Sequence, residues 1–179
     1  MNINELEHIL PQSQLKPCLV IGYGNTLRGD DGAGQKVAEI VADWELAQVR
    51  SLPAHQLTPE FAALLAESEL AIFVDVYPVT ELAIAESAEA EIKAIPIHPS
   101  TYRHDTSVCE GAGHAVDPHS LLCLAEVAYG HAPTAWWILI PATNFEFSEQ
   151  LSSLAQAGIA KALQKIEQIV KRGGTQPRN

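Results

Sequence analysis

The feature of the sequence that most constrains its fold is the alternation of short apolar runs with longer segments of helical period. Apolar runs of about four to eight residues, bounded by turn residues, are typical of buried strands. Strands that alternate with helices indicate an α/β sandwich built on a mainly parallel sheet. The expected strands are Cys18–Gly22, Val49–Leu52, Leu70–Val76, Glu91–Ile97 and Trp136–Ile140.

Helices are expected after the first, second and fourth strands and after the last one. One helix is expected to open at Thr58-Pro59, with threonine as its cap, and another at Asp117-Pro118. Residues 98–116 show no clear period and are expected to form a long loop, and residues 1–16 a short helical or loose lead-in. The predicted apolar faces are Val37, Ile40, Val41 and Trp44; Leu121, Leu124, Ala125 and Ala128; and Ile159, Leu163, Ile166 and Val170.

The length and composition favour one folded domain, which we assign to residues 1–172 with a polar tail at 173–179. The chain has 179 residues, of which 47% are hydrophobic and 18% charged, so it is not a disordered chain. Its net charge of −11 comes without a Lys/Arg cluster, which argues against nucleic acid and anionic membranes as partners. It lacks an apolar stretch of roughly 20 residues, a secretion signal and, with three cysteines, a disulfide framework. We therefore expect a cytoplasmic protein.

The topology of such a sheet indicates where a ligand-binding site would lie. Ligands of α/β sheets bind beyond the carboxyl ends of the strands, where the strand order reverses. In the common order, the first strand and the strand that ends at Asp75 flank that crevice. The acids Asp30 and Asp31, which follow the first strand, are therefore expected at the same edge as Asp75.

The loop from Gly22 to Gly34 is rich in glycine, yet it does not match a nucleotide-binding loop. Leu27 stands where the dinucleotide fingerprint needs its third glycine, and the Gly-Lys-Ser/Thr of a P-loop is absent. Two adjacent aspartates would also repel a phosphate at the start of a helix. The glycines are explained by turns, and one aspartate by a helix cap. The second aspartate is a candidate cation ligand.

Asp75 and His119 are the other candidate site residues, each with a structural alternative. A carboxylate at the end of an apolar strand is costly unless it is paired or bound to a metal, but it could instead bond loop N–H groups. His119 lies in the first turn of a helix, whose dipole favours the neutral, metal-binding imidazole, but it could equally be a surface histidine. Two carboxylates and an imidazole suit a divalent transition metal, or acid/base work on a peptide or ester.

Other chemistries find less support in the residues. His98, His104, Cys109 and His114 lack the paired spacing of a structural zinc site. A Gly-x-Ser-x-Gly elbow is absent, and no cysteine has a base beside it in a known local signature. A nucleophilic enzyme and a structural zinc protein are therefore disfavoured.

Three motifs in this order resemble those of the nickel–iron hydrogenase maturation proteases. Gly22-Tyr23-Gly24-Asn25-Thr26-Leu27-Arg28-Gly29-Asp30-Asp31-Gly32-Ala33-Gly34 resembles the opening signature of that family. Phe73-Val74-Asp75 and Asp117-Pro118-His119-Ser120-Leu121 resemble its second and third sites. His55-Gln56-Leu57-Thr58-Pro59-Glu60 also resembles the branch found with bidirectional and uptake-type hydrogenases. The resemblance covers residues 17 to 170.

The resemblance implies a three-layer α/β/α sandwich around a mixed sheet of five strands. It implies an endopeptidase that removes a C-terminal extension from the precursor of the [NiFe] hydrogenase large subunit after nickel insertion. The metal-facing residues would be Asp31, Asp75 and His119, which recognise nickel that the substrate already carries, and Asp30 would serve the loop or the helix cap. The alternative is a non-catalytic nickel metallochaperone that uses the same residues.

Overall fold

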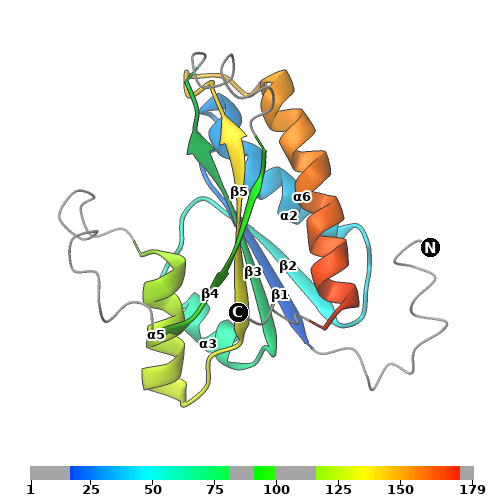
Figure 1. The fold of residues 1–179 in the computed structure, drawn as a ribbon. Helices are drawn as coiled ribbons and strands as arrows, with labels where there is room; N and C mark the ends of the chain where they lie inside the picture. Colours follow the sequence, from blue (N-terminus) through cyan, green and yellow to red (C-terminus); the bar gives the residue numbers. More distant parts are fainter. Residues whose placement is uncertain (1–16, 81–90, 100–115, 174–179) are drawn as a thin grey trace.

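The protein folds around a mixed, five-stranded sheet, seen in a computed structural model that describes residues 17–80, 91–99 and 116–173 (Figure 1). The strand order is β2-β1-β3-β5-β4. Only β4 runs antiparallel to its neighbour, β5, and the other pairs are parallel. The predicted sheet is therefore confirmed. Its strands are β1 (Cys18–Tyr23), β2 (Val49–Ala54), β3 (Leu70–Pro78), β4 (Lys93–Ile97) and β5 (Thr134–Ala142).

Helices cover both faces of this sheet, which gives the expected three layers (Figure 1). On one face, α2 (Ala33–Ala42) and α6 (Ser153–Lys171) bury their apolar sides against residues such as Ile72. On the other face, α3 (Phe61–Ala66) and α5 (Pro118–Tyr129) pack in a second cluster around Phe73. A short 3-10 helix, η2 (Gly29–Gly32), joins the loop after β1 to α2.

The alternation of side chains along the strands decides which face the site residues occupy. Ile21 and Phe73 belong to the core on the α3/α5 face. Tyr23 and Asp75 each lie two residues further along the same strands, and successive side chains of a strand point to opposite faces. Both therefore lie on the α3/α5 face, Tyr23 at the carboxyl end of β1 and Asp75 in the second half of β3. The adjacent tryptophans of β5 lie on opposite faces of the sheet: Trp136 enters the core on the α2/α6 face, and Trp137 packs on the other face.

Helix α5 begins where the sequence predicts, but it buries a slightly different face. The Asp117 carboxylate accepts a hydrogen bond from the backbone N–H of Ser120 (2.7 Å), and the Ser120 hydroxyl oxygen accepts one from the Asp117 N–H (3.0 Å). This capping box holds the first turn. The predictions for Leu124 and Ala128 were wrong: both are exposed, Leu124 by 37%, and Leu122 is fully buried instead. Because α5 packs against α3 as well as the sheet, its buried face is turned toward that helix.

The other boundaries differ from the predicted ones by a few residues. Helix α3 begins at Phe61, because Thr58 and Pro59 form a preceding turn whose carbonyls accept hydrogen bonds from Phe61 and Ala62. Residues 1–16, 100–115 and 174–179 lie outside the described residues, and with them the expected lead-in and most of the loop at 98–116. Among the helices that are described, none is long and apolar enough to cross a membrane.

Candidate active site at the carboxyl ends of β1 and β3

The glycines of the loop after β1 allow α2 to start directly against the strand. A Cβ atom on Gly22 would overlap the carbonyl oxygen of Gly34, at the point where strand and helix cross. Gly24 has a φ of 136°, a conformation that favours glycine, and a Cβ there would overlap the carbonyl oxygen of Asp31. These glycines fold the loop back over the strand end, which keeps Asp31 at the edge of the sheet.

Asp30 is a structural carboxylate. It is fully buried and accepts hydrogen bonds from the backbone N–H groups of Thr143 (2.9 Å), Asn144 (3.0 Å) and Ser152 (2.6 Å), and from the Ser152 hydroxyl (2.7 Å). Burial raises its pKa, but these donors outweigh burial and hold the pKa below its usual value. Asp30 does not cap α2, whose N-cap Gly32 has no side-chain bond. It ties the β1 loop to the loop before α6 instead.

Asp31, the next residue, faces a cavity of about 360 Å³ at the carboxyl ends of β1 and β3. Its Oδ2 accepts a hydrogen bond from the backbone N–H of Asn25 (2.8 Å). The two neighbouring aspartates therefore have different roles, because Asp30 points into the protein and Asp31 points into the cavity. The residues that line the cavity are Tyr23, Gly24, Asp31, His55, Gln56, Leu57, Thr58, Pro59, Asp75 and Val116.

Asp75 lines the same cavity, and its environment opposes ionisation. Burial and then the negative charge of Asp31 raise the pKa of Asp75 to about 6, against hydrogen bonds from Val76 and Tyr23 that lower it. The Val76 N–H donates to Oδ1 (2.7 Å), and Tyr23, which lines the same cavity, also lowers the pKa of Asp75. The carboxylate therefore takes up a proton more readily than an exposed aspartate would, yet it is mostly ionised at pH 7.

His119 lies near this cavity but does not line it. Its ring, in the first turn of α5, meets Trp137 edge-on with ring centroids 6.1 Å apart. Val116, just before α5, is a lining residue. The structure thus brings Asp31 and Asp75 around one cavity and leaves His119 beside it. Within residues 17–80, 91–99 and 116–173, no three His, Cys, Asp or Glu side chains are grouped so that they could hold a metal ion.

Among the lining residues that were not selected from the sequence as site residues, Tyr23 and His55 carry titratable side chains. Tyr23 is the last residue of β1, and His55 follows β2, the strand that pairs with β1 up to the register of Tyr23 with Ala54. Both therefore stand at the carboxyl ends of neighbouring parallel strands. The topological argument that selected Asp75 could have found them as well.

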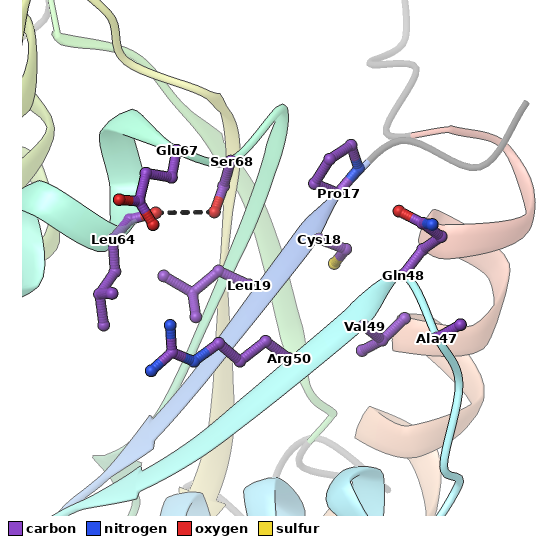
Figure 2. A pocket seen from close by; sticks show the side chains of 10 residues that line it. All are labelled: Pro17, Cys18, Leu19, Ala47, Gln48, Val49, Arg50, Leu64, Glu67 and Ser68. Carbon is purple, nitrogen blue, oxygen red and sulfur yellow. Dashed lines mark hydrogen bonds between the residues drawn. The ribbon is translucent and has the colours of Figure 1, made fainter. Parts of the chain in front are cut away.

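A second cavity, of about 210 Å³, lies at the opposite end of β1 (Figure 2). It is lined by Cys18, Arg50 and Ser68 among others, and the Ser68 hydroxyl donates to the Leu64 carbonyl (2.8 Å). Burial raises the pKa of the Cys18 thiol to about 12, so this cysteine is not a nucleophile at neutral pH. Since α/β sheets bind ligands at the carboxyl ends of their strands, the cavity with the two acids is the better candidate site.

The fold and the site together define an α/β protein with paired carboxylates at the switch point between β1 and β3. No protein-family model matches the sequence, and neither does any curated protein.

Solved structures of hydrogenase maturation proteases do match. The [NiFe] hydrogenase maturation protease HycI from Thermococcus kodakarensis KOD1 is 18% identical, with a TM-score of 0.64 over 88% of this chain and 95% of that one. The hydrogenase 2 maturation peptidase from Thaumarchaeota archaeon SCGC_AB-539-E09 is 23% identical, with a TM-score of 0.61 over 89% and 100%. The hydrogenase maturating endopeptidase HybD from E. coli is 17% identical, with a TM-score of 0.66 over 88% and 93%. The chain therefore has the fold of these proteases over nearly their whole length.

Proposed function

We propose that this protein is an endopeptidase that removes the C-terminal extension from the precursor of a [NiFe] hydrogenase large subunit after nickel has been inserted. The observation that carries the proposal is the meeting of Asp31 and Asp75 in one cavity at the switch point of the sheet. The shared fold with hydrogenase maturation proteases supports it. We place the reaction in the cytoplasm, in keeping with the sparse cysteines of the sequence.

In this proposal the nickel is part of the substrate, and Asp31, Asp75 and His119 are the residues that recognise it. Carboxylate and imidazole groups suit a divalent transition metal. Asp75, with a pKa of about 6, is mostly ionised at pH 7 and available as a ligand. Because His119 lies beside the cavity and not in its lining, ligation by all three requires the histidine side chain to turn from Trp137 toward the acids.

The chemical contribution of such a site is positioning. Nickel held by the precursor and contacted by the protease would bring the scissile bond to the cavity, and a well-oriented contact lowers the barrier by proximity. A precursor without nickel lacks the anchor. Cleavage is therefore expected only after metal insertion, which makes the site a checkpoint.

The test is a gel-shift assay on the purified precursor of the large subunit, loaded with nickel or free of it. Shortening of the nickel-loaded form alone would support both the peptidase and the checkpoint. Shortening of both forms would keep the peptidase and remove nickel recognition by Asp31, Asp75 and His119. The exposed Asp43, at the C-cap of α2, supplies a matched control: Asp43→Asn should cleave like the wild type.

The metallochaperone alternative predicts a different result in the same preparation. A carrier would shorten neither form of the precursor and would retain about one nickel ion per chain after purification. A protease that meets nickel only on its substrate should be purified without it. Metal analysis of the purified protein separates the two.

A further inference from the structure

We propose that Leu27 and Phe147 form a docking surface for the folded part of the hydrogenase large-subunit precursor, beside the cavity that Asp31 and Asp75 line. The inference rests on the proposed function, because it says where the substrate of that site is held. Phe147 lies in the loop between β5 and α6 and is 85% exposed, and Leu27, in the loop after β1, is 45% exposed. Neither side chain contributes much to the core, so both are available to a partner.

The two loops that carry these side chains are bonded to each other along their backbones. The Ser148 N–H donates to the Leu27 carbonyl (3.0 Å), and the Gly29 N–H donates to the Ser148 carbonyl (2.6 Å), in a short parallel bridge. The Asp30 carboxylate holds both ends of the loop between β5 and α6 as well. Because Phe147 directly precedes Ser148, Phe147 and Leu27 are brought together on one surface.

The backbone of this surface is fixed before any partner binds. The Asn25 Oδ1 accepts a hydrogen bond from the Leu27 N–H (2.9 Å), and the Asn144 Oδ1 accepts one from the Glu146 N–H (3.1 Å). Such contacts set the local turns. A surface that is already ordered loses less conformational entropy on binding, and exposed aromatic side chains are common anchors of protein interfaces. The loops therefore present Phe147 as an anchor.

The size of a protein interface indicates why the occupant is the substrate of the neighbouring cavity. Leu27 precedes Asp31, a lining residue, by four positions in the same loop, and four residues span at most about 14 Å. A standard interface covers about 800 Å² of each partner, which is about 30 Å across. A folded precursor whose cleavage site enters the cavity therefore covers Leu27 and, with it, Phe147. A short peptide would not need to reach them.

The charges around Phe147 favour such a partner over a second copy of this chain. Glu146 and Glu149 are exposed on either side of Phe147, and in the two loops the acids outnumber the single base, Arg28. In a symmetric dimer through this surface, the same acids of each copy would face one another. The net charge of −11 adds to that repulsion. The surface therefore fits an apolar pocket with basic groups at its rim.

The test measures binding of the purified precursor, loaded with nickel or free of it, by surface plasmon resonance. Phe147→Ser should weaken binding of both forms about tenfold, because the surface contacts the protein part of the substrate and not the metal. Phe147→Leu should restore most of the affinity. Val127→Ser is the matched control: Val127 is 84% exposed on α5, which ends at the opposite end of the sheet from the loop between β5 and α6 (Figure 1). It should bind like the wild type.

Cleavage of the nickel-loaded precursor gives a second readout. KM is expected to rise about tenfold in Phe147→Ser, while kcat changes less than about twofold, because the surface holds substrate and transition state equally. Circular dichroism verifies that each variant is folded. A loss confined to kcat would contradict a docking role.

The outcomes separate this proposal from the proposed function. If the wild type cleaves the precursor and Phe147→Ser binds it equally well, only the docking surface is overturned. If the wild type binds through Phe147 but cleaves neither form, only the peptidase is overturned. A wild type that binds neither form overturns both. A wild-type dimer in analytical ultracentrifugation that Phe147→Ser abolishes would assign the surface to a second copy and overturn the proposal.

Discussion

Asp30 and Asp75 are two carboxylates near the same edge of the sheet whose pKa values the protein shifts in opposite directions. Asp30 is fully buried, yet its pKa is lowered, because four donors surround it. Asp75 is partly exposed, yet burial and then the negative charge of Asp31 raise its pKa, because it has fewer donors to offset them. Burial raises the pKa of both carboxylates, and the number of donors decides whether that rise is outweighed. Asp30, whose carboxylate has four donors, holds two loops together, and Asp75, which has fewer donors, faces a cavity.

The largest expected effect is on cleavage activity and follows from replacing a proposed site residue. Asp75→Asn and His119→Ala are expected to leave a folded protein that cleaves the nickel-loaded precursor at least about a hundredfold more slowly, because the group that contacts the metal is lost. The measurement is the cleavage rate at saturating precursor, with circular dichroism to verify folding. Normal processing by either variant would remove that residue from the proposed mechanism.

The next effect is on stability and concerns Asp30. In Asp30→Asn an amide NH₂ would face some of the donors of Thr143, Asn144 and Ser152, and the charge that those bonds stabilise is lost. We expect the free energy of unfolding to fall by about 3 kcal/mol, measured by urea denaturation at pH 7. The exposed control Asp43→Asn should change it by less than about 0.5 kcal/mol. An equally small decrease in the free energy of unfolding of Asp30→Asn would contradict the conclusion that Asp30 holds the two loops together.

A smaller effect is the pH dependence that Asp75 contributes. Its folded pKa of about 6 lies above the value of about 4 expected in the unfolded chain. The stability it contributes is therefore fully present below pH 4 and is lost as the pH rises through 6, by roughly 2 to 3 kcal/mol. Unfolding curves of wild type and Asp75→Asn, measured from pH 4 to 7, should show the wild type losing stability relative to the variant. A constant difference would refute the raised pKa.

The smallest effect is expected at Asp117, a carboxylate whose side chain caps α5 through one backbone N–H. Asp117→Ala should cost about 1 kcal/mol of unfolding free energy, as is usual for the loss of an N-cap. Asp117→Ser should restore most of it, because serine is also a good cap. If alanine and serine destabilise equally, the capping box does not hold the start of α5.

The strands β1, β3 and β5 were predictable because each is a local apolar run that a sheet covered on both faces requires. The start of α5 was predictable too, since Asp117, Pro118 and Ser120 act within one turn. The buried face of α5 was not: Leu122 and Leu124 are equally apolar, and only the position of α3 decides which one is covered. Tyr23 escaped selection for a similar reason, because its place beside Asp75 in the cavity depends on the pairing of β1 with β3.

The sequence by itself determined the order of strands and helices and the edge of the sheet where acids gather, because period, caps and strand ends are properties of neighbouring residues. The tertiary structure decided how each acid at that edge is used. Asp30 and Asp31 are the same type of residue. The groups that donate hydrogen bonds to the Asp30 carboxylate lie 113 to 122 residues away in the chain. Only folding brings those donors to one of the two carboxylates. The other is left facing the cavity with Asp75.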